Sequence, residues 1–319
     1  METVDCNLCG SSDYALVYEM PDRFFFPDEF FKVVECNHCG LGFVNPRPSI
    51  GEIGKYYPRA YFEPFSRDRK QHLRRYSNEA KYLLGIERRE GPKMLLDVGC
   101  AEGDFPRFMK ARGWIVEGVE VSSETAPIRD FKVYNQPLHE IPVERPTYDA
   151  VTAWAVIEHV HDPMAYFRKA GEVTKQGGLF VFLLQNFESL ASRCLFCEDV
   201  PRHLYFFTEK TVKQYLEKTG FKLIRAEYKA SIYGMVAVNW LSYLIKTKLK
   251  KEPFRFSDRH LTRTEWLIRK NLKTGLLSDL RYALAVPEAV IEKALMPLVT
   301  KTQILRKTFG TCTYVARKP

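Results

Sequence analysis

The sequence lacks any long apolar run. Its longest mostly apolar stretch, Ser231 to Ile245, contains Asn239 and falls short of the roughly 20 residues that a membrane-spanning helix needs. The first residues, METVDCNLCG, lack the basic start and apolar stretch of a secretion signal. No Gly/Ser-rich or Gln-rich tract interrupts the chain. We therefore expect a cytoplasmic protein that is folded throughout and has no spanning helix.

The charge of the chain is unevenly distributed. The 319 residues carry a formal net charge of +9, but residues 235–319 hold 17 Lys/Arg and 6 Asp/Glu, so the basicity belongs to the C-terminal quarter. Such a segment is typical of contact with nucleic acid, an anionic membrane surface or a phosphorylated substrate, and equally of a well-solvated helical surface. Charge alone does not choose among these four.

Two cysteine pairs near the N-terminus have the spacing of metal ligands. Each pair has the form C-x-x-C and is followed by glycine. Cysteines in a cytoplasmic protein indicate metal sites or buried thiols before disulfides, and a C-x-x-C turn brings two thiolates to one tetrahedral ion. We therefore predict a structural zinc ion in a zinc ribbon over residues 1–50, held by Cys6, Cys9, Cys36 and Cys39.

The 26 residues between these pairs slightly exceed the usual ribbon spacing. They contain two aromatic, strand-like stretches, Arg23–Phe26 and Phe30–Val34, which predict an inserted hairpin. A third pair, Cys194 and Cys197, has no second pair to complete a tetrahedron. Ordinary thiols are favoured there over a second metal site.

A glycine-containing turn follows the apolar stretch Met94–Val98 and leads into a helical segment. Gly99 and Gly103 give the spacing G-x-x-x-G, which lets the backbone approach a ligand but differs from the G-x-G-x-x-G fingerprint of NAD sites. The next strand, Trp114–Val121, places Glu120 near its end, where a carboxylate can accept hydrogen bonds from ribose hydroxyls. Together these features indicate a nucleotide-like cofactor other than NAD.

Further apolar strands alternate with helical segments along the chain. Tyr148–Val160 predicts a buried strand that continues into a turn, a helix start follows at Asp162, and Leu179–Leu184 predicts another strand. This alternation predicts an α/β fold, a Rossmann-like doubly wound, mostly parallel sheet. Thr311–Arg317 is expected to close the sheet as an antiparallel edge strand, which makes residues 235–308 a helical insertion before the last strand.

At these motifs the sequence resembles the class I S-adenosylmethionine-dependent methyltransferases. The resemblance covers residues 90–230 and rests on LLDVGCAEGDF (95–105), GVEVS (118–122), YDAVTAWAVIEHVHDP (148–163) and GGLFVFLLQN (177–186). The stretch CGLGFVNPRPS (39–49) further resembles the subset with an N-terminal zinc ribbon, which is often encountered in pathways that methylate sugars or cell-surface glycoconjugates. The resemblance implies S-adenosylmethionine as the cofactor.

By position, the resemblance implies contacts between the glycine turn and the methionine part of the cofactor. Asp97 would support the turn, and Trp154 and Ala155 would lie near the sulfonium. The alternative for Asp97 is an ordinary strand-end carboxylate, and for Trp154 it is core packing. The turn residues concerned are Gly99, Cys100, Ala101 and Gly103.

The same resemblance implies where the nucleoside lies. Glu120 would hold the ribose, and Val121 would flank the adenine. Leu138 or His139 would line the other face of the adenine, although core packing is an equal alternative for Leu138.

Two histidines are candidates for chemistry. Methyl transfer needs a general base only where the acceptor must lose a proton. His203, in a stretch similar to the His-x-x-x-Phe-Thr element of related methyltransferases, is the first candidate for a base or substrate ligand, and His159 is the second. The alternative for both is that the imidazole fixes its loop through hydrogen bonds.

The insertion has the composition of a surface-seeking segment. Residues 236–251 combine an apolar stretch that contains Trp240 and Tyr243 with a lysine-rich end, as interfacial helices do, although a helix packed on the core is the alternative. The protein would then contact the inner face of the membrane peripherally. A second amphipathic segment is expected to begin at Pro287 and to carry on one face Val290, Ile291, Ala294 and Leu295.

The expected reaction is methyl transfer to a small molecule or glycoconjugate, in particular a nucleotide-linked or lipid-linked sugar whose phosphate meets basic residues of the insertion. Nucleic acid is a disfavoured partner. Residues 1–40 contain only two basic residues, Arg23 and Lys32, and a larger number of acidic residues, which would repel phosphate. RNA methylation and a catalytically silent cofactor-binding scaffold remain the alternatives.

The expected domains follow from these motifs. They are a zinc ribbon over 1–50, a helical linker or cap over the cofactor site at 51–90, a methyltransferase core of 91–234 with 309–319, and a basic helical insertion at 235–308 that contributes to the acceptor site.

Overall fold

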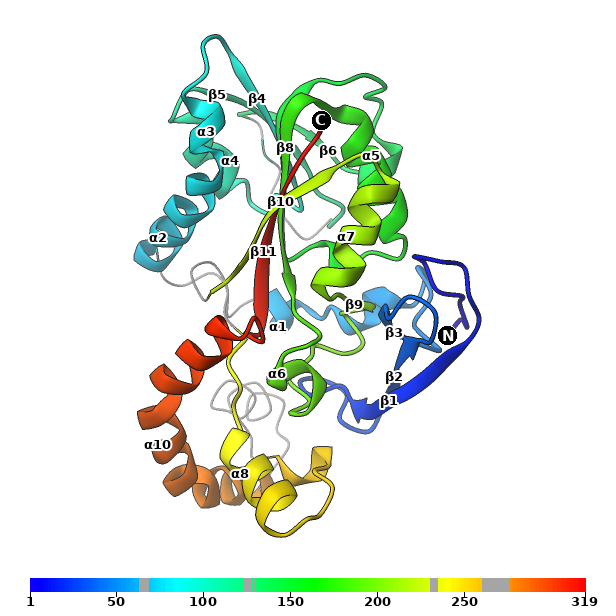
Figure 1. Ribbon diagram of the computed structural model, residues 1–319, viewed down its shortest axis with the longest axis vertical. Coiled ribbons are helices and arrows are strands. Elements are labelled where there is room, and N and C mark those ends of the chain that lie inside the picture. Colours follow the sequence, from blue (N-terminus) through cyan, green and yellow to red (C-terminus); the bar gives the residue numbers. More distant parts are fainter. Residues whose placement is uncertain (63–68, 123–127, 129, 230–234, 260–275) are drawn as a thin grey trace. The chain divides into compact units, whose positions relative to one another are not determined.

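The computed structural model describes residues 1–62, 69–122, 128, 130–229, 235–259 and 276–319. The chain forms two compact units (Figure 1). No helix within the described residues is long and apolar enough to cross a membrane. The first unit consists of Met1–Glu63, Gln185–Thr208 and Gly234–Thr311, and the second unit of Pro64–Leu184, Glu209–Tyr233 and Cys312–Pro319.

A seven-stranded sheet forms the centre of the second unit, in the order β10, β11, β8, β7, β4, β5, β6. Neighbours from β8 to β6 pair in parallel, whereas β10 and β11 are antiparallel. The predicted Rossmann-like, mostly parallel sheet is confirmed. The strands are β4 (Lys93–Val98), β5 (Trp114–Val119), β6 (Lys132–Tyr134), β7 (Tyr148–Trp154), β8 (Thr174–Gln185), β10 (Lys222–Tyr228) and β11 (Thr311–Arg317).

The last strand is present, but it is not at the edge of the sheet. β11 lies between β8 and β10 and is buried along nearly its whole length, whereas β10 carries the exposed side chains of an edge strand. The expectation of an edge position is therefore wrong. The apolar run TCTYVA is what a strand covered on both faces requires.

The second unit has helices on both faces of its sheet. The side chains of β8 alternate between the two layers: Val181 and Leu183 belong to the core cluster that includes α2 and α4, whereas Phe180 and Phe182 contact Phe167 of α5. Figure 1 shows α2, α3 and α4 on one side of the sheet and α5 and α7 on the other. These helices are α2 (Arg69–Ala80), α3 (Leu84–Glu87), α4 (Asp104–Lys110), α5 (Pro163–Val173) and α7 (Glu209–Lys218).

The helix start predicted at Asp162 is confirmed. Its Oδ1 accepts a hydrogen bond from the backbone N–H of Ala165 at 3.0 Å, and Pro163 is the first residue of α5. The cap satisfies an N–H group of the first turn that has no partner within the helix, and proline at this position loses no helical hydrogen bond.

A four-stranded antiparallel sheet organises the N-terminal part of the first unit, in the order β1, β2, β3, β9. The hairpin between the cysteine pairs is present, but a strand over Arg23–Phe26 is wrong. These residues form the turn, because Asp22 Oδ1 accepts the backbone N–H of Phe24 at 2.8 Å and bends the chain. The strands are β1 (Tyr14–Pro21), β2 (Phe30–Cys36), β3 (Gly42–Val44) and β9 (Tyr205–Phe206).

Several helices lie in the rest of the first unit. α8 and α10 pack through an apolar cluster that contains Cys197, Trp240 and Met296. The expectation that a helix begins at Pro287 is wrong, because α10 starts earlier and continues through this proline. A proline removes one helical hydrogen bond, which α10 tolerates while its C-terminal half packs on α8. The helices are α1 (Arg59–Phe62), α6 (Leu190–Arg193), α8 (Trp240–Leu244), a π-helical turn at Ile245–Leu249, and α10 (Leu276–Leu305).

Candidate cofactor site and cysteine cluster

The loops after three neighbouring strands meet at one edge of the seven-stranded sheet. β4 lies between β5 and β7, and the chain continues from β4 to β5 and β6 on one side and to β7 and β8 on the other. In an open parallel sheet, ligands bind at the carboxyl ends of the strands where the order reverses in this way. Gly99 after β4, Glu120 after β5 and Ala155 after β7 therefore begin the loops of the candidate cofactor site.

The turn after β4 has room only for small residues. Gly99 has a φ of +69°, and a Cβ at this position would lie 2.5 Å from Val156 Cγ2. At Gly103, an added Cβ would lie 2.8 Å from the ring of Phe131. Cys100 is buried within the turn, and burial raises the pKa of its thiol. The two predicted glycines therefore serve the close packing of the turn itself.

The Glu120 carboxylate joins the β4 and β5 loops. Its Oε2 accepts the backbone N–H of Ala101 at 2.8 Å, and its Oε1 accepts the backbone N–H of Ser122 at 2.8 Å. The side chain is buried. Each oxygen keeps a further lone pair for another donor, so this geometry fits a carboxylate that binds ribose hydroxyls while it holds the glycine turn.

Asp97 is buried near the end of β4. Its Oδ1 accepts a hydrogen bond from Thr152 Oγ1 at 2.6 Å, and burial raises its pKa to about 8. The negative charge of Glu79 acts in the same direction, so two buried acids lie close enough to influence each other. A cation bound beside them would favour the ionised carboxylates.

Nothing in the sequence singles out Glu79, the second buried acid. It follows Arg75 by four residues, which is the spacing of an ordinary surface ion pair. In the structure its carboxylate is fully buried, Oε1 accepts from Arg75 Nε at 2.7 Å, and Oε2 has no hydrogen-bond partner among the described residues. Burial raises its pKa. A buried carboxylate oxygen in this state is available to a donor from a ligand or from an ordered water.

Trp154 lies at the end of β7 in the same core cluster. Its ring centroid lies 5.7 Å from that of Phe105 and 6.3 Å from that of Tyr82. Its Nε1 is buried and has no hydrogen-bond acceptor within the described part of the chain. The ring thus packs in the core, while the indole N–H remains available to an acceptor atom of a ligand.

The residues predicted around the adenine differ in exposure. Leu138 is buried, whereas Val121 is 62% exposed. His139 is exposed, with Nε2 3.6 Å from a Glu140 carboxylate oxygen and its ring 5.7 Å from the ring of Tyr166. The contacts of these three residues with an adenine stay predictions.

His203 belongs to a buried polar network of the first unit. Its Nδ1 lies 2.9 Å from Glu198 Oε2, and its Nε2 lies 3.4 Å from Gln185 Nε2. Glu198 is itself buried and accepts a hydrogen bond from Ser192 Oγ. A carboxylate beside an imidazole fixes the orientation of the ring. Such a pair suits a general base, and it also holds the loop.

The loop that carries His203 is fixed by Arg202, whose guanidinium is fully buried. Its NH1 and NH2 groups donate to the two carboxylate oxygens of Asp22 at 2.9 and 2.8 Å, and its Nε donates to Asp199 at 2.8 Å. Although burial acts to raise it, the Arg202 charge holds the pKa of Asp199 well below its ordinary value. Asp22 lies 180 residues away along the chain, so sequence patterns do not reveal this contact.

His159 ends the short 3-10 helix Ile157–His159 that follows β7, and its side chain is half-buried. Its backbone N–H donates to Val156 O at 3.0 Å and closes the turn. A role of its imidazole in catalysis stays a prediction.

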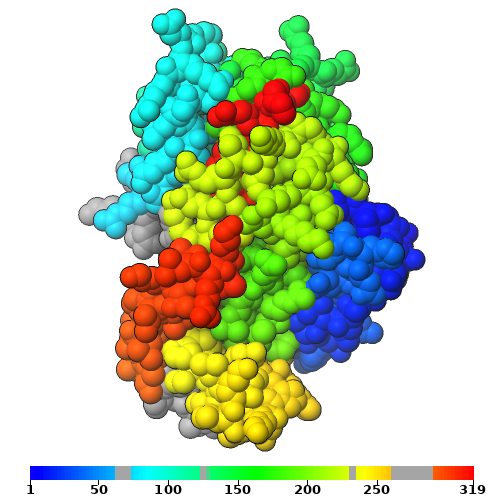
Figure 2. Space-filling model, in the orientation of Figure 1, coloured from blue at the N-terminus to red at the C-terminus, as the bar shows by residue number. Residues whose placement is uncertain are grey.

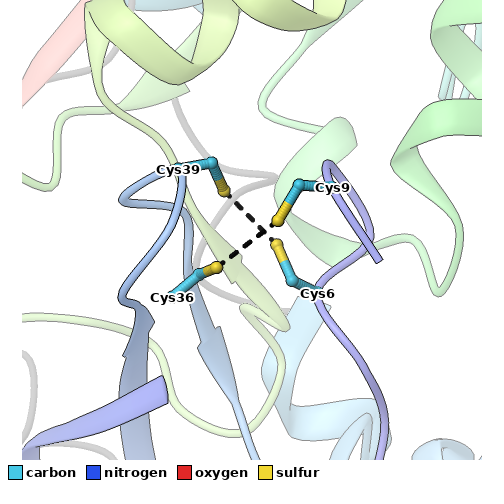
Figure 3. Close-up of side chains that lie close together, drawn as sticks. All are labelled: Cys6, Cys9, Cys36 and Cys39. Carbon is cyan, nitrogen blue, oxygen red and sulfur yellow. Dashed lines mark hydrogen bonds between the residues drawn. The ribbon is translucent and has the colours of Figure 1, made fainter. Parts of the chain in front are cut away.

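The four predicted metal ligands come together in the first unit. Figure 3 shows their sulfur atoms pointing toward one another. All four lie within 4.8 Å of each other, with 3.4 Å between Cys6 and Cys39 and 3.5 Å between Cys9 and Cys36. Sulfur atoms about 2.3 Å from one tetrahedral ion lie about 3.8 Å apart, so the cluster is consistent with a zinc ribbon.

The two cysteine turns have matching backbones. The N–H of Gly10 donates to Cys6 O at 2.7 Å, and the N–H of Gly40 donates to Cys36 O at 2.9 Å. Both glycines have positive φ, which explains why each C-x-x-C pair is followed by this residue.

Comparison with known families agrees with this site. Residues 67–226, about half of the chain, match the family described as a methyltransferase domain, and the chain belongs to this family. Family membership, the glycine turn and the acidic strand end together define an S-adenosylmethionine-dependent methyltransferase of class I.

The most similar relatives include the ubiquinone biosynthesis O-methyltransferases of two bacteria. The protein of Bordetella bronchiseptica is 27% identical over 183 residues, which are 49% of this chain and 75% of the relative. The protein of Ruegeria pomeroyi is 26% identical over 207 residues, which are 59% of this chain and 82% of the relative.

Solved structures are similar to this chain in fold. The cyclase SpnF has a TM-score of 0.50 at 17% identity and covers 86% of this chain and 98% of its own. A protein solved in complex with the Trm112 methyltransferase activator of Haloferax volcanii has a TM-score of 0.48 at 16% identity, over 81% of this chain and 96% of its own. At 17% identity the likeness to the cyclase concerns the fold alone.

Proposed function

We propose that the chain transfers a methyl group from S-adenosylmethionine to a lipid-linked or nucleotide-linked sugar or glycoconjugate. The observation that carries the cofactor site is the buried acidic pair, Asp97 and Glu79, beside a glycine turn at the point where the sheet order reverses. When bound, the cofactor supplies an activated methyl group on a sulfonium. The residues of the chain bind it, orient it and exclude water.

The residues of the second unit fit both ends of this cofactor. Glu79 Oε2 lacks a donor, and the cofactor carries an ammonium group that would supply one. The indole N–H of Trp154 lacks an acceptor, and the carboxylate of the cofactor would provide it. Glu120 would accept the ribose hydroxyls through the lone pairs that Ala101 and Ser122 leave available.

The acceptor class rests on two independent supports. The relatives above are named O-methyltransferases of ubiquinone biosynthesis, which supports methyl transfer to an oxygen atom of a biosynthetic intermediate. The C-terminal quarter, with 17 Lys/Arg and 6 Asp/Glu, provides the positive charge that a phosphate-linked acceptor attracts. Residues 235–308 would shape the acceptor site, and residues 51–90 would cover the cofactor.

Either predicted histidine would receive a proton where the acceptor is a hydroxyl. The carboxylate of Glu198 would orient the His203 ring, and a fixed imidazole within reach of the acceptor is what a general base needs. His159 is the second candidate, at the end of the loop after β7.

The cysteine cluster would hold one zinc ion with a structural role. Four thiolates complete a tetrahedron, so the ion would have no open position for a substrate.

Titration with S-adenosylmethionine tests the cofactor site. We expect Glu79→Gln and Glu120→Ala to weaken binding by about tenfold or more, because each removes a charge-assisted hydrogen bond from a buried site. Glu144→Gln is the matched control, since Glu144 is exposed, and it should bind like the unmodified protein. Full affinity in a folded Glu79→Gln protein would remove Glu79 from the site.

Product formation tests the acceptor. Lipid-linked and nucleotide-linked sugars would be offered with radiolabelled cofactor, and label should appear in one of these classes. His203→Ala should bind the cofactor normally and slow this transfer. Cofactor binding together with transfer only to a phenolic quinone precursor would replace the sugar with that acceptor, and binding without any transfer would favour the silent scaffold.

A further inference from the structure

The C-terminal half of α10 exposes its most apolar face. Val290 is 62% exposed, Leu298 65% and Leu305 76%. Figure 2 shows this helix, in orange to red, on the surface of the molecule. Large apolar side chains gathered on one side of a helix normally face the core. The exposed apolar residues on this side are Val290, Ile291, Ala294, Leu295, Leu298 and Leu305.

The opposite face of α10 is already occupied within the first unit. The Glu292 carboxylate is buried and accepts the backbone N–H groups of Asn239 at 3.0 Å and Leu241 at 2.9 Å. Met296 and Val299 pack in the cluster with α8. These contacts fix the rotation of α10 about its axis, so its apolar face is held outward.

Basic side chains surround and interrupt this apolar face. Lys301 lies three residues after Leu298 and four before Leu305, which places it between them on the same side of the helix. Lys293 is exposed on the neighbouring side, and Arg306 and Lys307 follow the end of the helix. From Val290 to Lys307, where all side chains are described, the one acidic residue is the buried Glu292, so no acidic side chain is exposed.

We propose that the outer face of α10, from Val290 to Leu305, docks on an anionic membrane surface. The leucines would enter the boundary between headgroups and acyl chains, and the lysines would meet lipid phosphates. This inference deepens the proposed function, because its biological role rests on a lipid-linked acceptor that is reached at the membrane.

The mixture of leucine and lysine favours a membrane over a protein partner. Lysine is depleted from the centre of protein interfaces, where its charge would lose water without a matched partner. At a membrane surface, the same side chain lays its apolar stem along the lipid and extends its ammonium group to the headgroups. Lys301, between two exposed leucines, suits the second environment.

The proposed membrane-binding face of α10 does not include Trp240 and Tyr243, the aromatic residues that the sequence indicates for membrane contact. Trp240 is buried in the cluster between α8 and α10, and the Tyr243 ring packs on Phe254 at 5.6 Å. These rings hold the helices together.

Sedimentation with vesicles tests this surface without any acceptor. The full-length protein would be mixed with vesicles of phosphatidylcholine and phosphatidylserine in equal parts, and with vesicles of phosphatidylcholine alone. We expect binding to the anionic vesicles and about tenfold weaker binding by the double variant Leu298→Gln and Leu305→Gln, which removes apolar area and keeps the charge. Ile50→Gln, at another exposed apolar residue, is the matched control and should bind normally.

The possible outcomes separate the alternatives. Equal vesicle binding by the double variant and the unmodified protein, or no binding by either, would overturn the proposal. An unmodified protein that is dimeric in solution and a double variant that is monomeric would show that a second copy covers this face instead. Cofactor affinity, measured on the same samples, reports on the proposed function separately, because the double variant lies outside the cofactor site.

Discussion

Single residues decide what the candidate site can bind. Asp97 and Glu79 are both buried acids, and burial raises the pKa of each; the Arg75 guanidinium pairs directly with Glu79 and acts on Asp97 only through its charge. A protein selected for stability alone would have little reason to bury two acids within reach of each other. The stability lost by burying these two carboxyl groups is understandable at a site that binds a cation, because function and stability compete there.

The free energy of unfolding should reveal the burial of Asp97. Its pKa rises from an ordinary 3.8 to about 8 in the folded protein, so the folded state keeps a proton that the unfolded state has lost between these values. This contribution to stability is present below about pH 4 and is lost as pH rises to about 8, with a slope of at most about 1.4 kcal/mol per pH unit.

Asp97→Asn should abolish the part of the pH dependence of the free energy of unfolding that comes from Asp97. Urea unfolding at several pH values between about 5 and 8 would measure it. The variant should lose less stability than the unmodified protein as pH rises, and it should also bind S-adenosylmethionine more weakly. The same pH dependence in both proteins would show that Asp97 titrates normally.

At the scale of elements, local patterns and distant pairing contribute differently. The apolar runs that predict β4, β5, β7 and β8 are sufficient because each strand is covered on both faces. β9 is only two residues long, and it exists because Tyr205 and Phe206 pair with Phe43 and Gly42 of β3. No run of that length can be recognised in a sequence.

The fold of the zinc ribbon should depend on a bound metal ion. Purified protein should contain about one zinc per chain, and Cys39→Ser should lose that zinc and melt at a lower temperature, because binding free energy of the ion is also folding free energy of the ribbon. Cys194→Ser is the control, since Cys194 lies outside the four-sulfur cluster. Unchanged zinc content in Cys39→Ser would mean that other ligands hold the ion.

At the scale of the whole molecule, the chain builds each unit from separate segments. The first unit combines the cysteine ribbon, residues 185–208 and residues 234–311, while the second unit contains the cofactor site. Each unit has its own apolar core. The second unit packs around Trp154 and Val181. The first unit packs around Val33 and Val44 of its sheet and, separately, around the cluster between α8 and α10. Interleaved segments of this kind leave no single boundary in the sequence.

Because the net charge is +9, binding to RNA and binding to anionic vesicles should depend differently on salt concentration. Binding to RNA would be mainly electrostatic and should be lost as salt rises from about 0.1 M to about 1 M, where the screening length falls from about 10 to about 3 Å. Binding to anionic vesicles should persist in part, because the leucines of α10 contribute independently of salt. Electrophoretic mobility shifts and vesicle sedimentation at matched salt would measure both. RNA binding that survives high salt would revive the RNA methyltransferase alternative.

The sequence by itself determined the class of cofactor, the parallel sheet and the four-cysteine cluster. These depend on spacing within short segments: the glycines of the turn, the acid at the end of the next strand, and two C-x-x-C pairs. Tertiary structure alone decided the burial of Glu79, the contact of Arg202 with Asp22, and the outward rotation of α10. Each of these depends on which face of an element meets a distant segment, and residue spacing within the element does not specify that choice.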